Sequence, residues 1–155
     1  MLQILLVMLL MLIFLQDLKT RSVYWFLFPV LMALSFIFAW RSITWAWAWN
    51  IGFLLLMMTV LTVYVSLKES RLVNITKGYF SWGDILFLLA VTPLFSLQLY
   101  VFFFTAGTVI SLLIHLVSMR FHRQDTIPYA GYMSLFLIPF IVFKDFMPGY
   151  LNFYA

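Results

Sequence analysis

Long apolar runs separated by short polar clusters make up almost the whole chain. A membrane-spanning helix needs about 20 largely apolar residues, within a range of roughly 17–25. Cutting the sequence at its charged and turn-forming clusters leaves six runs near that length, at residues 1–16, 24–40, 44–66, 79–97, 98–118 and 129–146. The pattern predicts an all-α, polytopic membrane protein with six transmembrane helices.

The boundary between the fourth and fifth runs carries the smallest polar signal. It falls at Phe95-Ser96-Leu97-Gln98, which contains no charged residue. Pro93 lies just upstream, and a proline cannot continue the hydrogen-bond ladder of a helix interior. We therefore expect one helix to end near Pro93 and the next to begin within a few residues.

Composition supports a lipid environment for most of the surface. Of 155 residues, 66% are hydrophobic and only 9% are charged, and the mean hydropathy is +1.09. Soluble domains carry about 25% charged residues, and disordered chains combine low hydrophobicity with high charge. Both classes are excluded. No stretch between the runs is long enough to fold separately, which predicts a single domain over residues 1–155.

The net charge of +4 indicates orientation rather than nucleic-acid binding, because the basic residues are scattered beside the apolar runs. Seven of the nine follow the first, third and fifth runs. Under the positive-inside rule these loops face the cytoplasm and both termini face outward. The tryptophans around residues 40–49 then lie at the outer interface, which indole rings favour. The seven basic residues on the predicted cytoplasmic side are Lys19, Arg21, Lys68, Arg71, Lys77, Arg120 and Arg123. The two on the predicted outer side are Arg41 and Lys144.

Two acidic residues border the apolar runs on the predicted cytoplasmic side. Asp17 follows the first run, and Asp84 heads the apolar part of the fourth. Two carboxyl groups close together in a poorly hydrated site cannot readily both ionise, so one retains a proton. The ionised group can then activate a water molecule while the protonated one donates to a carbonyl oxygen. Asp17 and Asp84 are therefore candidates for an aspartic protease pair.

Each acid also has a purely structural explanation. Asp84 could cap the helix that it begins by accepting hydrogen bonds from first-turn amides. Asp17 could be a solvated residue near Lys19 and Arg21. A metal or cofactor is not expected, because the chain has no cysteine and only two histidines. Of these, we expect His115 to be a structural interior side chain.

Three segments together are similar to one family of membrane proteases. Ser81-Trp82-Gly83-Asp84, followed by an apolar helix, resembles the Gly-x-Gly-Asp motif of the type IV prepilin peptidases, which include the archaeal preflagellin peptidases. Residues 17–21 resemble the Asp-led basic segment after that family's first core helix. Residues 127–132, which contain Pro128, are similar to its Ile-Pro-Phe-Gly-Pro segment. The three matches occur in family order.

The resemblance implies an aspartic endopeptidase in the plasma (inner) membrane, with its active site on the cytoplasmic side. It would remove the short basic leader from pilin-like precursors, with Asp17 and Asp84 as the catalytic pair and Gly83, Ser81 and Pro128 as substrate-binding or motif-supporting residues. Larger members also methylate the new amino terminus with the help of a cysteine-bearing domain, so we expect cleavage without methylation here. Ser81 departs from the family pattern, where the first motif residue is glycine.

Two functions of other classes remain open at this stage. A small ion-coupled transporter could use Asp84 as a proton site, since an acid within the membrane is costly and usually functional. A catalytically inactive relative that assists assembly would tolerate the loss of either carboxylate. Neither alternative predicts peptide cleavage.

Overall fold

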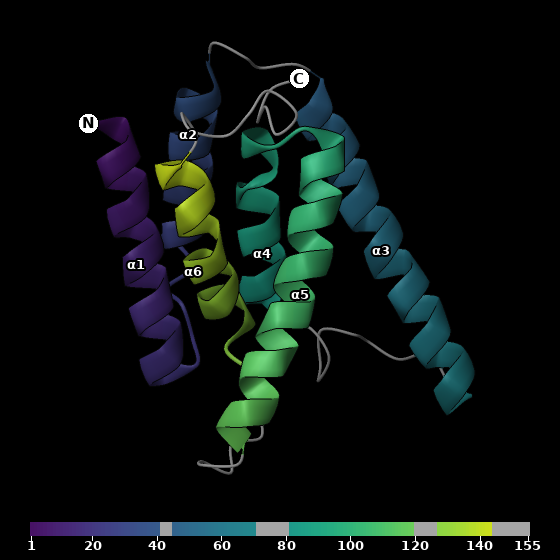
Figure 1. Ribbon diagram of the computed structural model, residues 1–155. Helices are drawn as coiled ribbons and strands as arrows, with labels where there is room; N and C mark the ends of the chain where they lie inside the picture. The colour runs from purple at the N-terminus through teal and green to yellow at the C-terminus, as the bar shows by residue number, and fades with distance from the viewer. Residues whose placement is uncertain (41–44, 71–80, 120–126, 144–155) are drawn as a thin grey trace.

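All regular structure in the described part of the chain is helical. The structure is a computed structural model that describes residues 1–40, 45–70, 81–119 and 127–143 (Figure 1). These ranges contain six α-helices, one short 3-10 helix and no strand, which confirms the expected all-α class. The elements are α1 (Leu2–Thr20), α2 (Leu27–Ala39), α3 (Ala46–Glu69), α4 (Trp82–Ala90), η2 (Thr92–Leu94), α5 (Leu97–Met119) and α6 (Tyr129–Val142).

The helices fall into two length classes. Among the described residues, α1, α3 and α5 are long and apolar enough to cross a membrane. By contrast, α2 has 13 residues and α6 has 14, and α4 has only nine before η2 begins. At about 1.5 Å per residue, a 14-residue helix is about 21 Å long, shorter than a hydrocarbon core of about 30 Å. Length and composition therefore identify three spanning helices, and the six-span topology stays a prediction.

Two helices continue past charged residues that were expected to end them. The first helix continues past residue 16 and includes Asp17, ending where Arg21 adopts a left-handed conformation with φ 54°. The Arg21 amide donates to the Asp17 carbonyl oxygen at 3.0 Å. The third helix likewise continues past residue 66 and includes Lys68 and Glu69. Lys68 and Glu69 can extend toward the interface, and Asp17 accepts a hydrogen bond from α6. These charged residues therefore do not end the helices at the predicted positions.

The core between α1 and α6 is built on one periodic row from each helix. Leu6, Leu10 and Ile13 are fully buried on α1, and Asp17 continues that row one turn later. Residues spaced by three and four lie on one face of a helix, so the row packs against a neighbour as a stripe. The partner row on α6 is Met133, Leu137 and Ile141.

A polar contact joins α1 and α6 at the end remote from Asp17. The Gln3 side chain donates to the Ile141 carbonyl oxygen at 2.6 Å. Carbonyls in the last turn of a helix lack partners within it, so a side chain from a neighbouring helix can supply one. Together with the apolar rows, this contact fixes the register of the two antiparallel helices.

The connection between α4 and α5 confirms the expected break near Pro93. Pro93 lies in η2, and α5 begins at Leu97. Asn50 on α3 is fully buried and donates from Nδ2 to the carbonyl oxygens of Thr92 and Phe95, at 2.9 and 2.7 Å. These bonds give the backbone acceptors at the helix interruption a side-chain donor.

The end of α1 and the beginnings of α4 and α6 lie at the same end of the bundle, the lower end in Figure 1. At that end of the bundle, α5 extends beyond the start of α6.

Six of the basic residues that entered the orientation count lie outside the described residues, as do His122, Asp125 and Asp145. The six are Arg41, Arg71, Lys77, Arg120, Arg123 and Lys144.

Candidate active site

Asp84 is held by two helices at once. Within α4 it forms a capping box with Ser81: the Asp84 amide donates to Ser81 Oγ at 3.2 Å, and the Ser81 amide donates to Asp84 Oδ2 at 3.0 Å. Its other oxygen leaves the helix, because Oδ1 accepts a bond of 3.1 Å from the Ala130 amide of α6. The capping expected from sequence is therefore present, and it accounts for only one of the two carboxylate oxygens.

Asp17 is directed into the bundle rather than toward solvent. Its side chain is only 6% exposed, so the reading of Asp17 as a solvated juxtamembrane residue is wrong. Asp17 Oδ2 accepts a 2.6 Å hydrogen bond from the Gly131 amide, 114 residues further along the chain. The reason is its helical position: because α1 continues through Asp17, the carboxylate stays on the buried row of that helix.

The two carboxylates converge on consecutive amides of one helix. Ala130 and Gly131 lie in the first turn of α6, where backbone N–H groups have no partner within the helix and where the helix dipole favours negative charge. Asp84 is 9% exposed and Asp17 is 6% exposed, and the amides that bind them belong to adjacent residues. The structure therefore brings the sequence-predicted pair together in a largely buried position.

One carboxylate oxygen of the pair differs from the other three. Both Asp84 oxygens and Asp17 Oδ2 accept backbone N–H groups. Asp17 Oδ1 receives no hydrogen bond from the residues that the structure describes. This oxygen can accept a hydrogen bond from a water molecule or a substrate group without breaking any existing bond. The arrangement is therefore suited to acid–base chemistry on a bound water.

The supporting residues named from sequence occupy the starts of the two short helices. Ser81 has extended backbone angles (φ −77°, ψ 154°), which serine adopts without strain, so a glycine is not required there. A Cβ built on Gly83 would make ordinary contacts with Ser81 and Phe28, at 3.5 Å and beyond. Pro128 is buried and immediately precedes α6. Of the three, Ser81 is the residue that hydrogen-bonds a carboxylate.

Sequence reasoning missed three residues at the start of α6. Ala130 and Gly131 act through backbone amides, which every non-proline residue possesses, so their side chains carry no signal. Tyr129 is buried, and its hydroxyl lies 2.9 Å from Thr108 Oγ1 on α5. The segment 127–132 was singled out, but its resemblance directed attention to Pro128 rather than to the residues after it.

His115 is buried on α5, as expected for an interior side chain, two turns beyond Thr108. No group of three or more acidic or histidine side chains that could hold a metal ion occurs within the described ranges.

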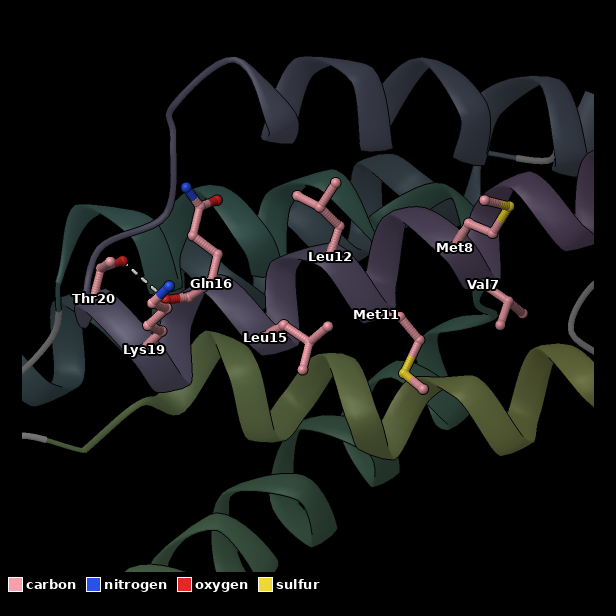
Figure 2. A pocket seen from close by; sticks show the side chains of 8 residues that line it. All are labelled: Val7, Met8, Met11, Leu12, Leu15, Gln16, Lys19 and Thr20. Carbon is pink, nitrogen blue, oxygen red and sulfur yellow. Dashed lines mark hydrogen bonds between the residues drawn. The ribbon is translucent and has the colours of Figure 1, made fainter.

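A shallow apolar hollow lies along α1 but on the side away from Asp17. Figure 2 shows its lining, which comes entirely from α1. Successive helical residues are rotated by about 100°, so Leu15 points about 200° away from both Ile13 and Asp17. The hollow belongs to the outward-facing surface of α1, and the carboxylate pair is not part of it. The lining residues are Val7, Met8, Met11, Leu12, Leu15, Gln16, Lys19 and Thr20.

No protein-family model, curated protein or solved structure matches the chain.

Proposed function

We propose that this protein is a membrane aspartic endopeptidase, similar to the prepilin peptidases, that removes the leader peptide from pilin-like precursors. The observation that carries the proposal is the convergence of Asp17 and Asp84, from α1 and α4, on the adjacent amides of Ala130 and Gly131. Two acids 67 positions apart meet in a site with little exposure. Burying two charged groups together is costly, so a function that uses both explains their presence better than helix capping alone.

The chemistry follows from sharing one proton between two carboxyl groups. The ionised carboxylate takes a proton from water as the water oxygen bonds to the scissile carbonyl carbon. The protonated carboxyl group gives its proton to the carbonyl oxygen, which produces a tetrahedral diol. The diol then gives a hydroxyl proton to the second carboxyl group, which is now ionised, while the first carboxyl group gives its proton to the amide nitrogen. The C–N bond breaks, and the pair returns to its starting protonation state. Neither a metal nor a covalent intermediate takes part.

The proposed orientation has six crossings, with both termini outside and the active site at the cytoplasmic face of the plasma membrane. It is supported by the basic residues after the first, third and fifth runs. Asp17 is near the end of α1 and Asp84 is in the first turn of α4. These two helix ends and the start of α6 lie at one end of the bundle, which agrees with a site near one membrane face. The proposed substrates have short basic leaders. Methylation is not proposed, since these 155 residues contain no cysteine.

The test is to replace each acid by asparagine, which keeps the side-chain shape and removes the charge. Membranes containing Asp17→Asn or Asp84→Asn should lose processing of a co-expressed pilin-like precursor, measured as the mobility shift that accompanies leader removal. Asp125→Asn is a matched control, because the sequence places Asp125 in a loop between the fifth and sixth runs. Undiminished cleavage by both active-site variants would overturn the catalytic pair.

The same experiment separates the alternatives. An assembly partner without activity predicts no cleavage even by the unmodified chain, together with normal assembly in both asparagine variants. An ion-coupled transporter predicts proton or solute flux into liposomes that depends on Asp84. No pair of interrupted helices occurs within the described ranges, and such pairs are typical of transporter binding sites. The peptidase therefore remains the function that we propose.

A further inference from the structure

Three consecutive residues at the start of α6 each contact a different helix. The hydroxyl of Tyr129 meets α5, the amide of Ala130 binds Asp84 on α4, and the amide of Gly131 binds Asp17 on α1. First-turn amides of a helix are free to make such contacts because they have no partner within it. Within the described ranges, the first turn of α6 is thus the element that donates hydrogen bonds to both carboxylates.

Gly131 differs from its neighbours because Asp17 occupies the space where a side chain would begin. A Cβ built on Gly131 would lie 3.1 Å from both Cβ and Oδ2 of Asp17, which is tighter than nine in ten Cβ contacts, so Asp17 would have to move by a few tenths of an ångström. Asp17 has little room to retreat, since it continues the buried row of α1 that includes Ile13. The need for glycine here comes from close approach and not from an unusual backbone conformation.

From this geometry we infer that Gly131 is a positioning residue for Asp17. Without a side chain at position 131, the backbone of α6 approaches α1 closely enough for a 2.6 Å hydrogen bond. Because the preceding amide binds Asp84, the spacing of two adjacent peptide groups sets the spacing of the two carboxylates. The catalytic consequence rests on the proposed function, whereas the hydrogen bond and its dependence on glycine do not.

The hydrogen bond can be measured without any enzymatic assay. The whole chain, labelled with ¹⁵N-glycine and placed in detergent micelles, gives a simple amide spectrum because it contains only six glycines. The Gly131 signal is assigned by its loss in Gly131→Ala. In Asp17→Asn it should move upfield, because a charge-assisted hydrogen bond to a carboxylate is replaced by a weaker one to a neutral amide. Gly52 is the internal reference, since nothing lies within 4 Å of a Cβ built there.

Kinetics then test the positioning role. Gly131→Ala should lower kcat for precursor cleavage by about 10-fold and change KM little, because Asp17 would have to shift by a few tenths of an ångström, and a displacement of about 1 Å at a reacting group can cost about 100-fold. Gly52→Ala, the matched control, should keep the rate of the unmodified chain. An unchanged kcat in a folded Gly131→Ala variant would overturn the inference, as would a Gly131 signal that does not respond to Asp17→Asn.

The two proposals fail separately. If the unmodified chain cleaves no precursor, the proposed peptidase function fails, and the Gly131 amide shift alone decides the positioning inference. If Gly131→Ala does not fold, ¹³C-alanine labelling narrows the ¹⁵N-glycine signals to the two glycines that follow an alanine, Gly107 and Gly131, and the response of these two signals to Asp17→Asn still decides it. If both asparagine variants cleave normally while the shift appears, the contact is structural and the positioning role in catalysis is refuted.

Discussion

The hydroxyl oxygens of Tyr129 and Thr108 lie 2.9 Å apart and tie the first residue of α6 to the middle of α5. Thr108 also donates its single proton to the carbonyl oxygen of Phe104 at 2.6 Å. A threonine hydroxyl has only one proton to donate, so in this pair the tyrosine is the donor. The contact therefore anchors the turn that holds both carboxylates to a long helix beside it.

Removing either hydroxyl should break the hydrogen bond between Tyr129 and Thr108 and lower the free energy of unfolding by a similar amount. Tyr129→Phe and Thr108→Val should each lower the free energy of unfolding by about 0.5–1.5 kcal/mol, the range for a single hydrogen bond. The double variant should cost less than the sum, because both changes remove the same bond. The measurement is unfolding of the detergent-solubilised protein by a denaturing surfactant. Strictly additive losses would contradict a direct bond between the two hydroxyls.

Asn50 should stabilise the break between α4 and α5. Asn50→Leu leaves the carbonyl oxygens of Thr92 and Phe95 without their donor, but it also removes the amide oxygen of Asn50, which is buried without a hydrogen-bond partner. The two effects oppose one another, so we expect a net loss of about 1–2 kcal/mol in the free energy of unfolding.

The matched control for Asn50 lies on the same helix. Thr59 is exposed, and its hydroxyl bonds only to the carbonyl of Leu55 one turn earlier. Thr59→Val should therefore change stability by no more than about 0.5 kcal/mol. An Asn50→Leu variant as stable as the control, under the same surfactant titration, would argue against a stabilising role for the amide.

The proposed orientation can be tested by cysteine labelling, because the natural chain has no cysteine of its own. Ser22 follows α1 and is exposed, whereas Trp45 is exposed at the start of α3. In intact cells a membrane-impermeant maleimide should label Trp45→Cys and leave Ser22→Cys unlabelled until the membrane is opened. The reverse pattern would place the carboxylate pair at the outer face and contradict cytoplasmic cleavage.

The helices themselves were largely predictable from local sequence, and their ends were less so. Apolar runs place every described helix, and Pro93 correctly indicated the break before α5. Treating Asp17 as the residue after a helix, rather than part of one, was the main error. A single charge is a poor stop signal, because a helix continues wherever its backbone bonds are favourable and the charged group finds a partner.

The sequence alone determined the all-helical class, the apolar surface and the two acids worth attention, since these depend on composition and on periodicity within one segment. Only the tertiary structure decided that Asp17 faces inward, that Asp84 bonds beyond its own helix, and that Gly131 lies against Asp17. The physical reason is that the donors are backbone amides, identical in nearly every residue. Their availability depends on where α6 begins, and their partners depend on how three helices distant in sequence pack together.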